Sequence, residues 1–427
     1  MKIRRTIPPT ATPIGPSSLL HGLAGLFMGR KYLKKLEEEV KEHFGTNHVF
    51  FVSSGKAALT VILKALKSLS PGRETVLIPA YTCFSVPSAI VTAGLKVSLC
   101  DIDPSTFDFD YTSLEDAMDK ETLCVLSTHL FGIPSDTDRI NGICKDRGIF
   151  VVEDAAQAMG GRVLHGEYKG RMLGTVGDAG LFSLSRGKNI TCGSGGIIIT
   201  GSGHIAGAIS KAYSSIGNPG TMETAREFLK ALALSLFIHP SLFWMPSGMP
   251  SLKLGAAGSC DDFPIKRLSG MQAGLLNIWR DQLEKSNRIR SANARYFTGQ
   301  LQMRSYGSAP IPLLRLPVIM KTKEARDRIS GLSSGKGLGI TRMYACPVNE
   351  MGGLREQFEG RSFPSASRVA ENLLTIPTHH LLSERDKKNI RALFEDAAIA
   401  GNPGAGVRRH IRISRHETHH HHRHRRR

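Results

Sequence analysis

The sequence predicts an α/β fold with a large, mostly parallel sheet and a smaller α+β C-terminal domain. Short apolar runs of strand length alternate with helical patterns through roughly the first 200 residues, as strand–helix–strand units do. A length of 427 residues also exceeds that of most single domains. The pattern changes near residue 258. We therefore expect an N-terminal segment and large domain over 1–257, a smaller domain over 258–400, and a basic, disordered tail over 401–427.

Helices and strands are expected where hydrophobic periodicity and turn residues agree. Leu36, Val40 and Phe44 lie on one stripe of a helix over 31–44, and Gly45 ends it. Strands of five or six residues are predicted at 48–52, 75–79, 96–101, 123–128, 149–153, 179–183 and 196–200. Further helices are predicted at 56–68, 84–93, 111–118 and 136–147.

The C-terminal part is expected to contain two helices and several short strands. Residues 265–301 form one long predicted helix, because leucine, isoleucine and methionine recur on one side of it. A last helix is predicted at 384–394, with Ser383 as its cap and Asp386 three residues further on. Mixed strands and loops are expected between the two.

The chain is basic, with a formal net charge of +19. Eight arginines and one glutamate in residues 407–427 contribute +7 of that charge. The rest is spread without a dominant block, and no nucleic-acid-binding motif accompanies it. We therefore expect the charge to steer anionic small-molecule substrates, and we expect no nucleic-acid partner.

The cysteines and the chain start indicate a reducing compartment. The seven cysteines are scattered without a C-x-x-C pair, which argues against a disulfide framework and against a zinc site. Pro8 and Pro9 follow the basic start where a signal peptide would have its apolar core. The most apolar segment, 231–245, is interrupted by His239 and Pro240 and is too short to cross a bilayer. A cytoplasmic protein without a transmembrane segment is expected, with 231–245 either as a buried or dimer-interface helix or docked on a membrane surface.

Two motifs place reactive side chains directly after predicted strands. Asp154 follows the apolar run 149–152, and Lys188 lies in a Gly- and Ser-rich loop after the strand 179–183. A lysine and a carboxylate are the pair needed to hold pyridoxal phosphate (PLP), since the lysine binds its aldehyde and the acid keeps the pyridine nitrogen protonated. A surface lysine and a helix-capping aspartate are the competing interpretations of each residue alone.

The motifs resemble those of the DegT/StrS family of sugar aminotransferases, which are fold-type I PLP-dependent enzymes. The family patterns E-D-x-A-Q, F-S…K-N and a Gly-rich turn correspond here to 153–157, Phe182-Ser183, Lys188-Asn189 and 193–196. The resemblance covers about residues 15–395. It implies transfer of an amino group from L-glutamate to a keto sugar, which we expect to be linked to a nucleotide, by a homodimer with its sites at the interface. The products would be aminosugars of polysaccharides or secondary metabolites.

The resemblance also implies a role for each matching residue. Lys188 is the expected catalytic residue, which holds the cofactor and moves a proton between substrate and cofactor. Asp154 is expected at the pyridine nitrogen, and Gln157 at the phenolic oxygen of the ring. Ser183 matches a second phosphate donor of the family. No metal site is expected.

The cofactor phosphate requires donors at a helix N-terminus, and residues 53–58 provide a strand, a small turn and a helix. Ser54, Gly55 and Lys56 are therefore expected at the phosphate. Lys56 stands where the family usually has threonine, so an ammonium replaces a hydroxyl as a point charge. Cys83 stands where an aromatic often stacks on the pyridine ring, and it packs there without stacking.

Other departures concern the partner subunit and the sugar. Ile265 stands near the position of an asparagine that reaches the partner's cofactor phosphate in the family, and Lys266 or Arg267 are candidate replacements. No histidine follows Pro347, so the sugar pocket is expected to differ. His129 is expected to bond to backbone rather than to act in catalysis.

Two alternatives to the sugar aminotransferase stay open at this point. One is another fold-type I enzyme, either a dehydratase or a different transaminase, although Lys188 favours transamination because some dehydrating relatives replace the lysine with histidine. The other is a non-catalytic regulatory protein that retains the fold, which the departures at Lys56, Cys83 and Ile265 keep open. A yellow colour from bound PLP distinguishes the last from the enzymes.

Overall fold

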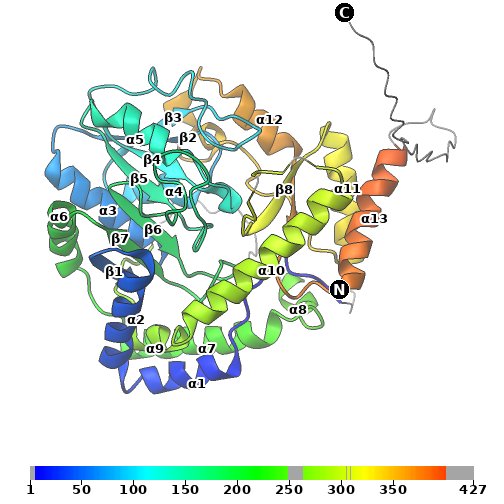
Figure 1. Ribbon diagram of the computed structural model, residues 1–427, viewed down its shortest axis with the longest axis horizontal. Helices are drawn as coiled ribbons and strands as arrows, with labels where there is room; N and C mark the ends of the chain where they lie inside the picture. Colours follow the sequence, from blue (N-terminus) through cyan, green and yellow to red (C-terminus); the bar gives the residue numbers. More distant parts are fainter. Residues whose placement is uncertain (1–4, 249–262, 304, 308, 401–427) are drawn as a thin grey trace, which may run out of the picture.

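A seven-stranded sheet forms the centre of the larger part of the molecule (Figure 1). The computed structural model describes residues 5–248, 263–303, 305–307 and 309–400. The strands follow the order β1-β7-β6-β5-β4-β2-β3 across the sheet. They are β1 (His48–Val52), β2 (Thr75–Pro79), β3 (Lys96–Cys100), β4 (Thr122–Thr128), β5 (Phe150–Asp154), β6 (Ala179–Ser183) and β7 (Gly196–Thr200).

The sheet is mostly parallel, as predicted. Only β7 runs against its neighbours, since it pairs antiparallel with both β1 and β6 while the other pairs are parallel. Every residue of β4, β6 and β7 is buried, because helices cover both faces of the sheet. The carboxyl ends of β4, β5 and β6 therefore meet at one edge, where open α/β sheets bind their ligands.

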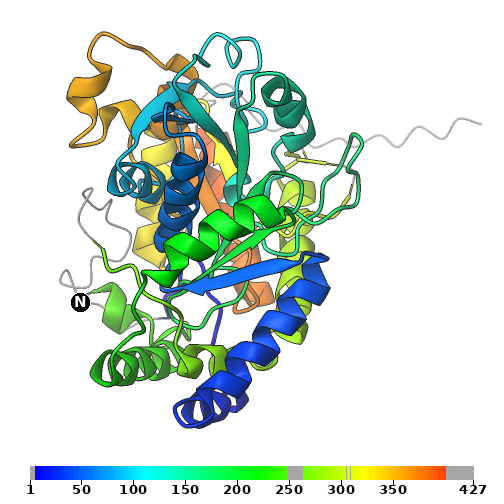
Figure 2. The same cartoon turned by 90° about the vertical axis from the view of Figure 1, so that its left-hand side faces the viewer.

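Helices pack on both faces of this sheet. One face shares a hydrophobic core with α3 (Gly55–Leu69), α4 (Ser85–Thr92) and α6 (Gly203–Ser214). The other face packs against α2 (Gly29–Phe44) and α9 (Gly270–Leu275), and α5 (Thr137–Lys145) contributes to a third cluster beside β4 and β5. Figure 2 views the molecule from the side of the edge strand β1, with α6 lying across it.

The C-terminal part adds a two-stranded sheet and three helices. β8 (Arg315–Ile319) and β9 (Leu373–Pro377) pair antiparallel. α10 (Trp279–Gln300) runs from α9 to this part, where α11, α12 and α13 lie (Figure 1). Buried residues of β8 and β9 belong to the same hydrophobic cluster as α3 and α4, so one core continues between the two parts. The remaining elements are α1 (Pro16–Gly25), α7 (Thr221–Phe237), α8 (Trp244–Ser247), α11 (Lys323–Lys336), α12 (Pro364–Asn372), α13 (Glu384–Ala400), and the 3₁₀ turns η1 (Leu130–Gly132), η3 (Val348–Glu350) and η4 (Arg355–Phe358).

The predicted helix over 111–118 is wrong, because this segment forms turns instead. The carboxylate of Asp110 accepts hydrogen bonds from the backbone and hydroxyl of Thr112 and from the hydroxyl of Ser113. Such local side-chain bonds compete with the backbone bonds of a first helical turn.

The predicted single helix over 265–301 is also wrong, since the structure breaks it into α9 and α10. α9 begins only after Ser269, whose hydroxyl accepts from the amide of Gln272 while the Gln272 side chain accepts from the Ser269 amide. This reciprocal capping fixes a helix start inside the segment, and Ile278 leaves helical geometry before α10 begins.

The helix α1 was missed by the sequence analysis, which placed the first helix at 31–44. Its glycines lower helix propensity, but they allow α1 to pack closely on α9. A Cβ at Gly25 would lie 2.4 Å from the carbonyl oxygen of Gly270. The glycines of α1 are therefore needed for its close contact with α9, and the same glycines weaken the helical pattern of α1 in the sequence.

The apolar segment 231–245 is divided between the end of α7 and α8. Ala231 is fully buried, whereas Leu232 and Leu236 on the same helix are exposed. Among the described residues, no helix combines the length and hydropathy needed to span a bilayer. The predicted domain boundary at 257/258 and the predicted tail over 401–427 lie outside the described residues.

Candidate active site

Lys188 lies in the loop between β6 and β7, and neighbouring segments hold its backbone. The hydroxyl of Thr12 donates to the Lys188 carbonyl, and that of Thr10 donates to the Gly187 carbonyl at 2.6 Å. Gly187 has a φ of 75°, which favours glycine at this turn. The next residue, Asn189, is buried and donates to the Asn287 side chain at 2.8 Å. The loop is therefore fixed on both sides of the lysine.

The side chain of Lys188 has the electrostatic surroundings of a reactive amine. Burial lowers the pKa of Lys188, the nearby Cys83 and Asp154 oppose that shift, and the positive charge of Arg315 adds to it. Among the described residues, no acceptor lies within hydrogen-bond or ion-pair distance of Nζ. An amine that is partly desolvated, without a partner and easily deprotonated is suited to nucleophilic chemistry.

Asp154 ends β5 at the same edge of the sheet. Its Oδ1 accepts from the backbone amide of Ala156 at 3.0 Å, and no hydrogen bond of Oδ2 is described. Burial raises the pKa of Asp154, while the Ala156 amide, Lys188 and His129 oppose the shift. A buried carboxylate with one free oxygen requires a donor, and a protonated ring nitrogen is one.

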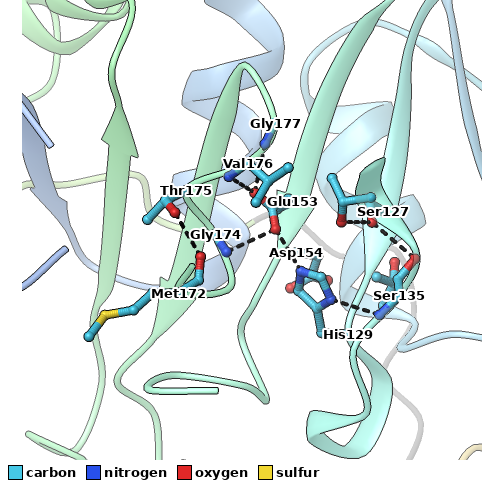
Figure 3. A network of polar contacts seen from close by, with 12 residues as sticks. Ser127, His129, Ser135, Glu153, Asp154, Met172, Gly174, Thr175, Val176 and Gly177 are labelled. Carbon is cyan, nitrogen blue, oxygen red and sulfur yellow. Dashed lines mark hydrogen bonds and ion pairs between the residues drawn. The ribbon is translucent and has the colours of Figure 1, made fainter. Parts of the chain in front are cut away.

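The preceding residue, Glu153, forms the network in Figure 3, which the sequence analysis did not single out as functional. Glu153 Oε1 accepts from the amides of Val176 and Gly177 at 2.6 and 2.7 Å. Its Oε2 accepts from the Gly174 amide and from His129 Nε2, both at 2.9 Å. Burial alone would raise the pKa of Glu153, but these bonds outweigh it and lower the pKa.

His129 is held on both ring nitrogens. Its Nδ1 accepts from the backbone amide of Ser135 at 3.0 Å, so the proton sits on Nε2 and points at Glu153. Both His129 and Glu153 side chains are fully buried. The expected bond of His129 to the backbone is present. The His129 amide also donates to the carbonyl of Asp154, so His129 links Asp154 to Glu153.

Gln157 is oriented by two partners. Its Oε1 accepts from the amide of Phe131 at 3.1 Å, and its Nε2 donates to the hydroxyl of Tyr344 at 2.9 Å. Tyr344, which reaches the site from the C-terminal part, was not predicted there. Burial raises the pKa of Tyr344, and the nearby Cys83 adds to that effect. The site therefore includes side chains from both parts of the molecule.

The expected phosphate residues meet at the N-terminus of α3. Ser54 caps this helix, since its hydroxyl accepts from the Ala57 amide at 3.0 Å. The amides of Gly55 and Lys56 have no described acceptor and stay available to an anion. Gly55 lies beside Ser183, because a Cβ at Gly55 would stand 3.1 Å from the Ser183 Cβ. The structure therefore brings the predicted donors together.

The charged side chains near this helix point elsewhere. The ammonium of Lys56 lies 4.3 Å from the ring centroid of Phe263. Lys266 forms an ion pair of 2.8 Å with Glu223, and the Arg267 guanidinium lies over the ring of Tyr213. Neither candidate replacement for the family asparagine is free of partners in its own chain.

Cys83 lies near Lys188 and Tyr344, as its electrostatic influence on both of their pKa values indicates. Its Sγ contacts the hydroxyl of Ser85 at 3.3 Å. Tyr344 packs edge-on against Tyr81, with ring centroids 5.7 Å apart. Aromatic surface is therefore present beside the cysteine, although the cysteine itself offers none.

The residues fit PLP. The free amine of Lys188, the free oxygen of Asp154 and the open N-terminus of α3 beside Ser183 are the three kinds of group that its aldehyde, ring nitrogen and phosphate require. The strand order is that of a fold-type I transferase, and the site lies at the carboxyl ends of its strands.

The chain belongs to the DegT/DnrJ/EryC1/StrS aminotransferase family, whose sequence profile matches residues 24–395. A pleiotropic regulatory protein of Geobacillus stearothermophilus is 35% identical over 176 residues, which is 41% of this chain and 45% of that protein. GDP-perosamine synthase of Escherichia coli O157:H7 is 34% identical over 169 residues, or 40% of this chain and 44% of the enzyme. These alignments span less than half of each relative.

Solved structures of the same fold cover nearly the whole chain. PseC of Helicobacter pylori, an aminotransferase involved in the biosynthesis of pseudoaminic acid, has a TM-score of 0.74 at 16% identity and covers 92% of this chain and 100% of its own. DesI, solved in the presence of its TDP-sugar product, has a TM-score of 0.73 at 19% identity and covers 94% of each chain. At these identities the comparison establishes the fold.

Proposed function

We propose that the protein is a PLP-dependent aminotransferase that moves an amino group from L-glutamate to a keto sugar carried on a nucleotide. The observation that carries the proposal is the half-buried amine of Lys188, for which no hydrogen-bond partner is described, near Asp154 at one edge of the sheet. Family membership supports the reaction class, and a relative named GDP-perosamine synthase supports the sugar. The product would be an aminosugar for a polysaccharide or secondary metabolite.

The proposal assigns cofactor contacts to the predicted residues. Asp154 would hold the ring nitrogen, Gln157 the phenolic oxygen, and Ser183 with the amides of Gly55 and Lys56 the phosphate. When bound, PLP supplies the carbonyl that accepts the amine and a ring that takes up electrons. No metal is assigned a part.

Lys188 transfers a proton in this proposal. Burial lowers the pKa of Lys188 and so favours the neutral amine, which can accept a proton from the substrate carbon and return it to another atom. The fixed loop around Thr12 and Asn189 limits how far Nζ moves between these atoms. The protonated ring nitrogen of PLP would favour the ionised form of Asp154, against the burial that raises its pKa.

We also propose a homodimer in the cytoplasm. Exposed apolar side chains on and beside α1 and on α7, among them Phe27 at 86% and Leu229 at 63% exposure, support burial against a second copy. The six described cysteines are free thiols, which suits a reducing compartment.

The test is the visible absorbance of purified protein before and after L-glutamate, for wild type, Lys188→Ala and the exposed control Lys169→Ala. We expect wild type and the control to be yellow and to lose the band with glutamate. Lys188→Ala should show no such change, with turnover lowered by about 10³-fold or more. Keto sugars on different nucleotides would then be screened as acceptors.

A wild-type protein that stays colourless after incubation with PLP contradicts the proposal. That result would favour the alternative of a non-catalytic regulatory protein. One relative is named a pleiotropic regulatory protein. A yellow protein that glutamate leaves unchanged would favour another PLP-dependent reaction.

A further inference from the structure

An irregular segment over residues 6–12 crosses from the C-terminal part to the loop that carries Lys188. It contains neither helix nor strand, and we call it the N-terminal strap. Figure 1 shows it in dark blue, on the path from beside α13 past α10 toward α1. Because the strap has no backbone ladder of its own, its place depends on hydrogen bonds to the elements that it crosses.

One end of the strap is bonded to the C-terminal part. The amide of Ile7 donates to the carbonyl of Gly337 at 2.9 Å, and His379 Nε2 donates to the carbonyl of Pro8 at 2.8 Å. Ile7 and His379 are both buried. Gly337 caps the end of α11, and His379 follows β9, so this end is anchored to elements of the C-terminal part.

The other end of the strap is bonded to the loop between β6 and β7. The hydroxyl of Thr12 donates to the carbonyl of Lys188, and that of Thr10 donates to the carbonyl of Gly187 at 2.6 Å. The packing here is also close, since a Cβ at Gly187 would overlap Cγ2 of Thr10. The strap therefore fixes the main chain from which the side chain of Lys188 extends.

Arg290 of α10 binds the strap between these two ends. Its Nη2 donates to the carbonyl of Ala11 at 3.0 Å and to the hydroxyl oxygen of Thr12 at 3.2 Å. Its Nη1 donates to the carbonyl of Leu314 at 2.9 Å and to the hydroxyl oxygen of Thr378 at 3.4 Å. Leu314 lies directly before β8 and Thr378 directly after β9, so Arg290 joins the strap to one end of each strand.

The two hydrogen bonds of the Thr12 hydroxyl have a fixed direction. A guanidinium has donors and no acceptor, so the Thr12 oxygen accepts from Arg290 and its single proton is left for the carbonyl of Lys188. Arg290 is 1% exposed and Thr12 is 9% exposed, so water competes little for either bond. The arginine thereby orients the hydroxyl that holds the lysine.

We propose that Arg290 and Thr12 are positioning residues for amino transfer, which act through the main chain of Lys188. The proposal rests on the aminotransferase function and deepens it, because it names residues outside the cofactor contacts that set where the reactive amine lies. The path from the ends of β8 and β9 through Arg290 and Thr12 also links the C-terminal part to the catalytic lysine. Proton transfer is sensitive to such placement, since a displacement of about 1 Å lowers a rate by roughly 100-fold.

A strap that only stabilises the fold is the competing explanation, and the two explanations differ in what Thr12 should affect. If the strap only stabilises the fold, loss of the Thr12 hydroxyl lowers the melting temperature and leaves the rate per folded molecule unchanged. If it positions the lysine, the same loss lowers the rate and leaves the affinity for the amino donor nearly unchanged. Affinity is spared because both bonds of the hydroxyl are used within the protein.

The experiment uses the full-length, PLP-loaded protein as wild type, Thr12→Val, Thr12→Ser, Arg290→Lys and the double variant Thr12→Val/Arg290→Lys. Thr298→Val is the matched control, because the Thr298 hydroxyl donates to a carbonyl of its own helix, α10. Single-turnover absorbance changes give the maximal rate and the apparent dissociation constant for L-glutamate. Amide hydrogen exchange of residues 184–192 in the cofactor-free protein reports on the loop, and thermal melting verifies that each variant is folded.

We expect Thr12→Val to lower the maximal rate by roughly 10- to 100-fold, while the apparent dissociation constant changes by less than about threefold. Thr12→Ser should recover a rate within about threefold of wild type, because it retains the hydroxyl. Amide exchange in the loop should rise by about tenfold in Thr12→Val. The control should match wild type in every measurement.

The double variant tests whether Arg290 acts through Thr12. Arg290→Lys should lower the maximal rate by about tenfold in the wild-type background, because a lysine keeps the charge and loses the fork. In the Thr12→Val background the same change should cost less than about twofold, since the path is already broken. Rate losses that multiply in the double variant would show that Arg290 does not act through Thr12.

A folded Thr12→Val that keeps the wild-type rate would overturn the proposal, whatever its melting temperature or loop exchange. If loop exchange depends on Thr12 while L-glutamate leaves the wild-type absorbance unchanged, the hold of the strap on Lys188 stands and the aminotransferase proposal fails. The two proposals therefore fail by different results.

Discussion

Two consecutive acids at the end of β5 face different surroundings. Glu153 receives four hydrogen bonds, from His129 and three backbone amides, and is fully buried. Asp154 receives one, from the Ala156 amide, and faces Lys188. Burial disfavours both charges, but only Glu153 has enough donors to lower its pKa. The saturated acid supports the fold, and the unsaturated acid has capacity left for a ligand.

Arg290, which is buried, and Arg315, which is partly exposed, repeat this contrast. Arg290 has protein acceptors for every nitrogen of its guanidinium, whereas Arg315 has acceptors for one. In both pairs one member keeps unused hydrogen-bonding capacity, and that member lies near Lys188.

The largest expected effect is a difference in the rate of amino transfer between variants of Asp154 and variants of Glu153. Asp154→Asn should lower the rate of amino transfer by roughly 10²–10³-fold, because an amide cannot stabilise a protonated ring nitrogen. Glu153→Gln should lower the rate by less than about tenfold in protein that remains folded, since Glu153 does not reach the cofactor side. Steady-state kinetics with saturating PLP measures both, and equal losses in the two variants would contradict the contrast.

The free energy of unfolding should change more in the Glu153 variant than in the Asp154 variant, which is the reverse of the order expected for activity. Glu153→Gln should lower the free energy of unfolding by about 3 kcal/mol, because its new amide group faces backbone donors that lose their acceptor. Asp154→Asn in the cofactor-free protein should change it by less than about 1 kcal/mol, or raise it, since a buried charge is removed. Urea denaturation at neutral pH measures both variants.

As the pH falls, the contributions of Glu153 and Asp154 to the free energy of unfolding change in opposite directions. The pKa of Glu153 is lowered from 4.5 on folding, so its contribution is present above pH 4.5 and is lost as the pH falls through the folded value. The pKa of Asp154 is raised from 3.8, so its charged form costs stability above the raised value, and that cost disappears as the pH falls toward 3.8. The deficit of Glu153→Gln should therefore shrink in acid, and so should any advantage of Asp154→Asn. A deficit of Glu153→Gln that grows in acid would refute this assignment.

The smallest expected effect concerns the anion site at α3. Gly55→Ala should weaken PLP binding by about tenfold, because the new Cβ lies 3.1 Å from the Ser183 Cβ where the phosphate donors meet. The matched control is Gly207→Ala in α6, where nothing lies within 4 Å of the added Cβ. The control should keep PLP affinity and gain less than about 1 kcal/mol of stability. Fluorescence titration of cofactor-free protein measures the affinity, and equal affinities in the two variants would remove Gly55 from the site.

The sheet was predictable because its strands are short apolar runs bounded by turn residues. β1, β2, β6 and β7 begin and end where the pattern placed them. The prediction of a helix over 111–118 was wrong, because hydrogen bonds to the Asp110 side chain compete with the backbone bonds of a helix. α1 was missed because its glycines serve the close packing of α1 on α9, and α9 lies far along the chain.

The sequence by itself determined the sheet, the lysine and acid at its edge, and the family, because strand patterns and local motifs are properties of neighbouring residues. Only the tertiary structure decided that Glu153 is saturated, that Tyr344 bonds Gln157, and that Nε of Arg315 has no hydrogen-bond partner. Hydrogen-bond saturation depends on donors and acceptors brought together from distant segments. No local pattern records which of two adjacent acids, or of two arginines, keeps unused hydrogen-bonding capacity.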